Sequence, residues 1–336
     1  MIFLSLIVAL ALVQWWGSGA PVQRDGWFYT WMERLQTVDA LGKVPGGYSF
    51  VAVLSPCLIL ALLIWGIQAW LSYMWVFFIA VPVLLYSLGR GNFTATVKAY
   101  LVAAKRGDSV AANRLLDEMR GDTLLVTEPD ANNWQELNHQ VLSAISYRGF
   151  ERMFAVLFWF VFLGPVGALL YRLSMLYRER SPDRFIERWV WLLEWPVVRL
   201  MGLTWALAGN FDTCFQHWKQ TTLDVTSASM PILRRQLLGA LGERGAVDAL
   251  EPELAEPASV ADSNPVGEEA PLTGQPPLDD DLLDDGFLSD EVEPSLVEAP
   301  AEPGHSRRLI SASLSLLTRS LLLWVCALAL VTLLGA

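Results

Sequence analysis

Cysteine and histidine are both scarce in this chain, with three residues of each among 336. The cysteines stand far apart at Cys57, Cys214 and Cys326, and no Cys-x-x-Cys pair occurs, which argues against a disulfide framework and a structural zinc site. The sequence contains no Gly-x4-Gly-Lys-Ser/Thr motif and no Gly-x-Ser-x-Gly motif, the usual signals of a nucleotide-binding loop and of a serine hydrolase. We therefore expect no cofactor, no metal ion and no catalytic residues.

Charge is also scarce, since charged residues make up 18% of the chain against roughly 25% in soluble domains. The formal net charge of -11 comes from one segment, because residues 245–306 lack Lys and Arg and hold 17 of the 35 acidic residues. The other 18 acidic residues are outnumbered by 24 basic ones, so the rest of the chain is mildly basic. This distribution argues against nucleic acid as a partner.

Long apolar runs are what the sequence has in excess, and they predict a multi-pass membrane protein. No charged residue occurs from Phe50 to Gly89, a run too long for one crossing of a bilayer and suited to two antiparallel helices. We place this transmembrane hairpin at 51–88, with its turn near Gln68 to Met74. A first transmembrane helix is expected at 1–16, in preference to a cleaved signal peptide because no basic residue precedes the apolar run. Residues 307–336 form a basic flank and a last transmembrane helix.

Two further apolar segments, 153–175 and 189–208, allow two topologies. If both cross, residues 172–189 with their five arginines lie outside, against the tendency of basic residues to stay in the cytoplasm. If neither crosses, the chain from Arg90 to Arg319 stays in the cytoplasm and both termini are periplasmic. We prefer this four-span topology to a six-span one, and expect the two segments to be re-entrant or interfacial helices that line a pocket.

The other segments complete an all-α fold class without strand-type alternation. They are a cytoplasmic loop, a cytoplasmic helical region, a membrane-associated core and an acidic, Pro-rich disordered linker, at 17–50, 89–152, 153–242 and 243–306 respectively. The helical region should contain a helical hairpin over 92–120 and a helix from Asn133 onward. Residues 211–241 predict an amphipathic helical stretch interrupted near Pro231.

The acidic linker has nine prolines and cannot support a packed core. Within it, residues 278–296 interleave leucine, phenylalanine and valine with aspartate and glutamate. Two interpretations stay open: this stretch is a solvated spacer, or it is a short motif that docks on a protein partner.

Several charged residues lie within or beside the apolar segments, where charge is costly and tends to be paired or functional. They are Arg148, Glu151, Arg152, Arg172, Glu194 and Arg199. One interpretation makes them interfacial charges that orient the helices. The other makes the arginines a binding pocket for a phosphorylated or carboxylated anion. Pro196 in addition allows a bend that brings Glu194 and Arg199 together.

A family resemblance rests on residues 154–172, which read Phe-Ala-Val-Leu-Phe-Trp-Phe-Val-Phe-Leu-Gly-Pro-Val-Gly-Ala-Leu-Leu-Tyr-Arg. This block resembles the signature of the AmpE membrane proteins, modulators of β-lactamase induction in Gram-negative bacteria. Its second half also resembles the adenosylcobinamide-phosphate synthases (the CobD/CbiB group), and the similarity continues from Trp195 to Arg199. The resemblance implies a bacterial inner-membrane protein with a regulatory or sensor function linked to β-lactamase induction and peptidoglycan recycling.

The resemblance to the synthases implies an alternative function, an enzyme that forms an amide bond with ATP. The synthases carry paired acids before the Trp-to-Arg block, where this chain has Val190 and Trp191. We therefore favour a non-enzymatic regulator that contacts the lipid bilayer and binds a small anion, either a cell-wall fragment or a phosphorylated metabolite. Its expected ligand-binding residues are Arg152, Gly164, Pro165, Gly167, Tyr171, Arg172, Glu194, Trp195 and Arg199.

Overall fold

The computed structural model describes the greater part of the chain, and every regular element in the described part is a helix. The described residues are 2–16, 24–37, 46–70, 73–88, 93–120, 133–181, 183–222, 228–243 and 303–334. The all-α prediction is confirmed for these residues. The proposed docking stretch 278–296 lies outside them.

Helices α1 (Ile2–Trp16), α3 (Gly47–Trp70), α4 (Val76–Ser87) and α15 (Pro303–Leu334) form in the apolar runs. A single 3₁₀ turn, Tyr73–Trp75, comes directly before α4. Helices α3 and α4 stand where the hairpin was predicted, and its crossing of the membrane stays a prediction. Among the described residues, three helices are long and apolar enough to cross a membrane, namely α3, α10 (Arg184–Ala208) and residues 305–332 of α15. Shorter apolar helices cover Phe3–Val13 and Val76–Ser87.

Helix α10 differs from the other two long apolar helices in how much of it is covered by protein. More than half of its most apolar window, 56%, is buried, against 22% in α3 and 17% in α15. A helix that other helices surround in this way exposes less surface to lipid than a peripheral crossing helix does. Its crossing is therefore not decided by its length, and the four-span topology stays a prediction.

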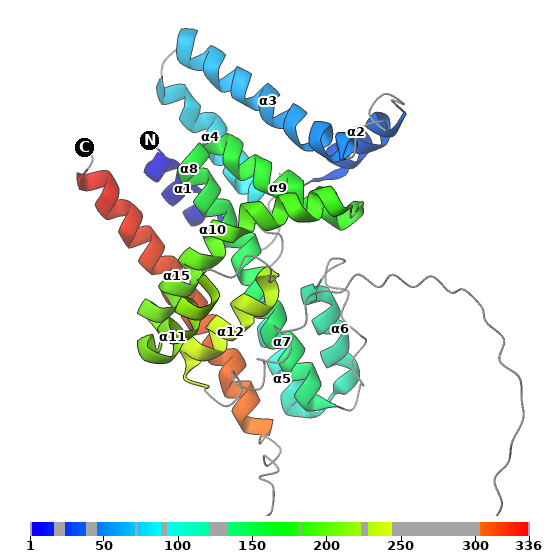
Figure 1. The fold of residues 1–336 in the computed structure, drawn as a ribbon, viewed down its shortest axis with the longest axis vertical. Coiled ribbons are helices and arrows are strands. Elements are labelled where there is room, and N and C mark those ends of the chain that lie inside the picture. The colour runs from blue at the N-terminus through cyan, green and yellow to red at the C-terminus, as the bar shows by residue number, and fades with distance from the viewer. Residues whose placement is uncertain are drawn as a thin grey trace, which may run out of the picture.

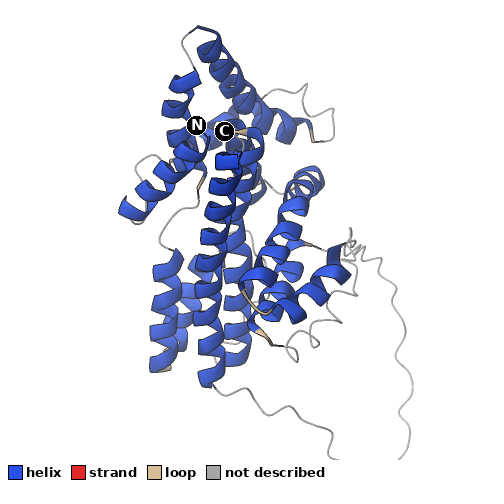
Figure 2. Cartoon of the chain, turned by 90° about the vertical axis from the view of Figure 1, so that its left-hand side faces the viewer, coloured by secondary structure: helices blue, strands red, loops and turns tan. Residues whose placement is uncertain are grey.

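The start of α1 and the end of α15 lie near each other at the upper left of Figure 1, and α1 packs against α4 (Figure 1, Figure 2). The helices α5, α6 and α7 lie toward the opposite end (Figure 1).

The region between the hairpin and the apolar segment folds as predicted. Helices α5 (Phe93–Arg106) and α6 (Ser109–Arg120) form a helical hairpin that reverses at Gly107, whose φ of 72° suits glycine. Asp108 begins α6 by accepting a hydrogen bond of 2.9 Å from the backbone N–H of Ala111. Helix α7 (Trp134–Gly149) packs on this hairpin, and the Tyr100 hydroxyl donates to Asn138 Oδ1 at 2.9 Å.

Two stretches differ from the sequence prediction because amphipathic faces override loop-like composition. The expected loop 17–50 contains α2 (Gly26–Gln36), which buries Phe28, Met32 and Leu35 on one face, at helical spacing. The last helix begins at Pro303, inside the expected linker 243–306 and well before the apolar run. Its first half contacts α7 and α5, with Ile310 fully buried.

The membrane-associated core follows as α8 (Val156–Leu163), α9 (Pro165–Arg180), α10, α11 (Phe211–Thr222) and α12 (Ser229–Leu241). The interruption expected near Pro231 lies earlier, because α11 ends at Thr222 and Pro231 stands in the first turn of α12. Proline fits there since the first turn of a helix has no acceptor for its N–H.

Candidate functional site

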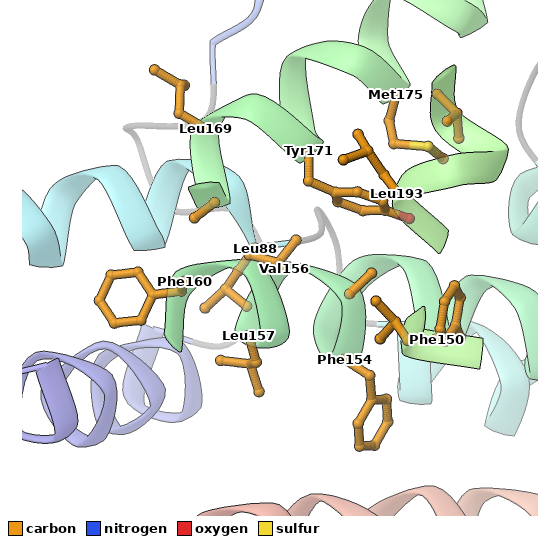
Figure 3. Close-up of a cluster of buried hydrophobic side chains, with 14 of the residues drawn as sticks. Leu88, Phe150, Phe154, Val156, Leu157, Phe160, Leu169, Tyr171, Met175 and Leu193 are labelled. Carbon is orange, nitrogen blue, oxygen red and sulfur yellow. The ribbon is translucent and has the colours of Figure 1, made fainter. Parts of the chain in front are cut away.

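The chain reverses direction at Gly164 and Pro165, so that α8 and α9 pack side by side as an antiparallel pair (Figure 3). Gly164 has a φ of 68°, a conformation that favours glycine, and Pro165 starts α9 at the position where proline is tolerated. A Cβ on Gly167 would lie 2.3 Å from the Trp159 carbonyl oxygen. The predicted residues Gly164, Pro165 and Gly167 therefore serve the backbone reversal and the close approach of the two helices.

This reversal limits how deep the segment can reach into a bilayer. Helix α7 continues through a π-helix, Phe150–Ala155, into α8. In this continuous helical segment only the last part, from Met153 to Leu163, is apolar. At about 1.5 Å per residue that end is roughly 16 Å long, about half of a hydrocarbon core of roughly 30 Å. A half-depth helix that turns back is the geometry of a re-entrant segment, which supports that prediction for 153–175.

Glu194 of α10 is the centre of a buried polar cluster between α7, α9 and α10. Its side chain is 3% exposed, and its Oε1 atom accepts hydrogen bonds from Tyr147 Oη at 2.8 Å and from Tyr171 Oη at 3.3 Å. Arg178 Nη1 lies 4.0 Å from the same oxygen, and Arg178 also donates to the Tyr147 hydroxyl. Burying a carboxylate is costly unless it is paired and hydrogen-bonded, and these contacts provide both.

The Tyr147 phenol stays protonated in this cluster. Burial raises its pKa well above the ordinary value, and the negative charge of Glu194 raises it further, which outweighs the opposing effect of Arg178. The neutral phenol donates one hydrogen bond to Glu194 while its oxygen accepts one from Arg178. Tyr147 thus links the acidic and basic members of the cluster.

Arg148 organises a second buried cluster one residue further along α7. Its Nη1 lies 2.7 Å from Glu151 Oε2 and 3.4 Å from Glu179 Oε1, and its Nε donates to the Arg120 carbonyl oxygen at 2.9 Å. Glu151 belongs to the π-helix, a type of segment that is rare and frequently found at functional sites. The cluster joins the end of α6 to α7 and α9.

Arg172 of α9 forms a third pair, with its Nη2 atom 3.3 Å from Oδ2 of Asp25 at the start of α2. Three arginines and four carboxylates therefore lie in these clusters, with Arg152 close by in the sequence. Each of these three arginines is paired with a carboxylate, so an incoming anion has to compete with a carboxylate for the arginine's charge. The predicted anion pocket is in this respect already occupied by the protein's own acids.

The structure does not bring all of the predicted site residues together. Tyr171 and Glu194 share one cluster and Arg172 lies in the neighbouring pair, but Arg152 stacks over the Phe93 ring at 5.5 Å. Arg199 stacks over the Trp195 ring at 4.5 Å and donates to the Trp195 carbonyl oxygen at 3.2 Å. The contact of Glu194 with Arg199 that a bend at Pro196 would allow is not among these interactions.

Sequence reasoning missed four members of the clusters: Asp25, Tyr147, Arg178 and Glu179. Arg178 lies seven residues after Tyr171, two helical turns along the same face of α9, and Tyr147 lies four residues before Glu151. These helical spacings could have placed Arg178 beside Tyr171 and Tyr147 beside Glu151. No local spacing could have predicted the ion pair of Asp25 with Arg172, since 147 positions separate them.

A cavity of about 380 Å³ is lined by none of the expected ligand-binding residues. It is lined by Gln36, Gly46, Tyr48, Ser49, Tyr177, Ser181 and Asp183. Within the described ranges, no group of three or more His, Cys, Asp or Glu side chains is placed to hold a metal ion. A synthase-type reaction with metal-bound ATP thus stays a hypothesis, to be tested by ATP turnover.

Comparison with known proteins gives one consistent result. The family model described as "Regulatory signalling modulator protein AmpE" matches residues 1–255. A curated relative, Protein AmpE of Shigella flexneri, is 26% identical over 179 residues, which cover 50% of this chain and 62% of that relative. The chain therefore matches less than two thirds of the relative's length. No solved structure gives a significant match.

Proposed function

The chain belongs to the AmpE family of regulatory signalling modulators, and from this premise we propose that it modulates β-lactamase induction from the inner membrane. The signal is proposed to come from peptidoglycan recycling, in the form of an anionic cell-wall fragment, a phosphorylated metabolite or a protein partner. The proposal assigns the protein a regulatory and not a catalytic function.

The observation that carries the proposal is the set of buried ion pairs that tie distant helices together. Glu194 on α10 contacts Tyr147 on α7 and Arg178 on α9, while Arg172 on α9 contacts Asp25 at α2. A shift of α9 relative to these helices would break several charge-assisted hydrogen bonds at once, and we propose that α9 therefore moves between discrete positions. Such an element is what a signal needs in order to pass from the membrane-inserted helices to α5, α6 and α7.

Arg172 is the arginine we propose to receive an anionic ligand. Its Nε atom is buried and has no hydrogen-bond partner among the described residues, while its Nη2 pairs with Asp25. An anion that binds the Nε side of the guanidinium satisfies this donor and competes with Asp25 for the same charge. Ligand binding is thereby coupled to the position of α2.

The proposal is tested by complementation in a Gram-negative strain that carries an inducible β-lactamase and lacks its own copy of this gene. Wild-type protein should restore the normal induction response to a sublethal β-lactam, measured as β-lactamase activity. Arg172→Gln should be present in the membrane at wild-type abundance and fail to restore it. Arg188→Gln, which removes an exposed arginine on α10, is the matched control and should restore it fully.

Two results would contradict the proposal in different ways. An induction response that is the same with and without the gene excludes the regulatory function. A normal response with Arg172→Gln at normal abundance keeps the function but removes the arginine from it.

A further inference from the structure

Three aromatic rings form a continuous stack along one side of α11, which we call the aromatic ladder. The Phe211 and Phe215 rings lie 5.0 Å apart with an interplanar angle of 12°, and the Phe215 and Trp218 rings lie 5.5 Å apart with an angle of 18°. These residues stand at positions i, i+4 and i+7, which share one side of a helix. Phe211 is 51% exposed and the other two are exposed in part, so the ladder belongs to the surface of the described residues.

The other two sides of α11 have different surroundings. One side is buried against α10 and α12 and contains Thr213 and Cys214. The remaining side is exposed and polar, with Asp212, Gln216 and Lys219. Around its axis the helix therefore has a protein-facing side, an aromatic side and a polar side. An amphipathic helix that lies in the interface plane of a membrane needs an apolar side and a polar side that are both uncovered by protein.

The surface of α10 beside the ladder is apolar as well. Leu200 and Leu207 stand seven residues apart on one face of α10 and are 39% and 59% exposed. Trp218 Nε1 donates a hydrogen bond of 2.7 Å to the Arg199 carbonyl oxygen, which holds the ladder against this helix. The Arg199 guanidinium lies over the Trp195 ring at 4.5 Å. Tryptophan and arginine combine an apolar body with a polar tip, a combination typical of side chains at membrane interfaces.

A hydrogen bond fixes the level of α10 relative to the last transmembrane helix. Trp324 Nε1 of α15 donates to Thr204 Oγ1 of α10 at 2.9 Å. Arg319 is exposed and is the last charged residue of α15, and at about 1.5 Å per residue Trp324 lies roughly 8 Å beyond it. Thr204 therefore stands near the level at which α15 enters the bilayer. In both the four-span and the six-span topology this is the cytoplasmic boundary.

We propose that the aromatic ladder and the exposed leucines of α10 lie in the phospholipid headgroup layer of the cytoplasmic leaflet, where α11 is an interfacial anchor. The polar side of α11 faces the cytoplasm, and the Arg199 charge lies among the lipid phosphates. The anchor holds the end of α10, the helix that carries Glu194, at a fixed depth. The proposal depends neither on the regulatory function nor on its ligand.

Nitroxide accessibility tests which side of α11 meets lipid. The full chain, with its three cysteines replaced by alanine, is spin-labelled at one introduced cysteine in nanodiscs of phosphatidylethanolamine and phosphatidylglycerol. Oxygen concentrates in lipid and a neutral nickel chelate stays in water, so the ratio of their collision rates reports the surroundings of the label. Labels at Phe211→Cys and Leu207→Cys should favour oxygen, whereas the matched control Gln216→Cys should favour nickel. Leu207→Cys keeps all three rings, so the test stands even if Phe211→Cys does not fold.

A fluorophore at the same positions tests the depth of the anchor. At Leu207→Cys and Phe211→Cys, lipid with a nitroxide on its headgroup should quench more strongly than lipid with a nitroxide at the end of the acyl chain. Leu330→Cys should show the reverse order, because it lies about 16 Å beyond Arg319, near the middle of a hydrocarbon core of roughly 30 Å.

Three results would overturn the proposal. Collisions dominated by nickel at Leu207→Cys and Phe211→Cys mean that the ladder faces water. Low collision rates with both reagents mean that protein, such as a second copy of the chain, covers it. Stronger quenching from the acyl-chain end at these positions means that α11 lies in the hydrocarbon core and not among the headgroups.

Discussion

Tyr147 Oη donates a hydrogen bond of 2.8 Å to Glu194 Oε1 across 47 positions of the sequence. This hydrogen bond joins α7, which packs on the α5–α6 hairpin, to α10 in the middle of the fold. Both residues are almost completely buried, with exposed fractions of 3% and 2%. Their contact is therefore a test of whether the buried charges stabilise the packing of α7 against α10.

Replacing Glu194 should destabilise the protein strongly. We expect Glu194→Ala to lower the free energy of unfolding by about 3 kcal/mol, because Arg178 and two phenols lose their buried acceptor. Tyr147→Phe removes one hydrogen bond to a charged group and should cost about 2 kcal/mol. Denaturant unfolding of detergent-purified protein measures both values. Glu187→Ala, an exposed position on the same helix, should change stability by no more than about 0.5 kcal/mol, and an equal effect of the two alanine variants would refute the assignment.

The arrangement of Arg172 and Asp25 predicts energetic coupling between α9 and α2. Asp25→Asn and Arg172→Gln should together cost less than the sum of the single variants, with a coupling energy of about 1–2 kcal/mol. A double-mutant cycle of unfolding free energies measures it. The cycle of Asp25→Asn with Arg188→Gln serves as control and should be additive within about 0.5 kcal/mol. Additivity in the first cycle would mean that the ion pair contributes nothing to stability.

The close packing of α8 on α9 predicts that Gly167 does not accept a side chain. Gly167→Ala places a methyl group 2.3 Å from the Trp159 carbonyl oxygen and should destabilise the protein by about 1–3 kcal/mol. Gly66→Ala on α3 is the matched control, since a Cβ there meets nothing within 4 Å and alanine is the better helix former. Thermal unfolding in detergent compares the two. A stable Gly167→Ala variant would show that α8 and α9 do not pack as tightly as described.

The helices could be predicted from the sequence wherever one property of the chain was sufficient to define them. The uncharged run from Phe50 to Gly89 fixed the α3–α4 hairpin, and Gly107 with Asp108 fixed the turn between α5 and α6. Helix α2 and the first half of α15 were not expected as helices, because their apolar faces are narrow and depend on neighbours that are distant in sequence. Phe28 and Ile310 show no exposure in the fold, yet neither stands in an apolar run long enough to predict a buried helix.

The candidate site could be predicted in part, for a similar reason. Glu194 and Arg172 were found as charges among apolar residues, a local property. Their partners Arg178 and Asp25 were not found, because ion pairing depends on which helices become neighbours. There was also no sign in the sequence that carboxylates of the same chain pair with the buried arginines, so that a ligand has to compete with them.

Burial of Cys214 predicts a thiol that does not react in the folded protein. Its Sγ donates weakly toward the carbonyl oxygens of Gly202 and Gln236, and burial raises its pKa to about 12. Below that pH the thiol form dominates, so maleimide labelling should stay negligible from pH 7 to 9 and increase only as the pH approaches the pKa. Peptide mass spectrometry measures the modified fraction, with protein unfolded in detergent as the fully labelled control. Complete labelling of folded protein at pH 8 would contradict the burial.

The position of the arginine-rich turn between α9 and α10 separates the four-span topology from the six-span one. In a variant without Cys57, Cys214 and Cys326, a cysteine in place of the exposed Arg184 should react with a membrane-impermeant maleimide only after the inner membrane is opened. The reason is that basic residues remain preferentially in the cytoplasm, and residues 172–188 carry five arginines. A cysteine in place of Gln68, at the end of α3, is the matched control and should react in cells whose inner membrane is intact. Reaction of both positions in such cells would make α10 a crossing helix, which its length permits, and the number of spans would rise to six.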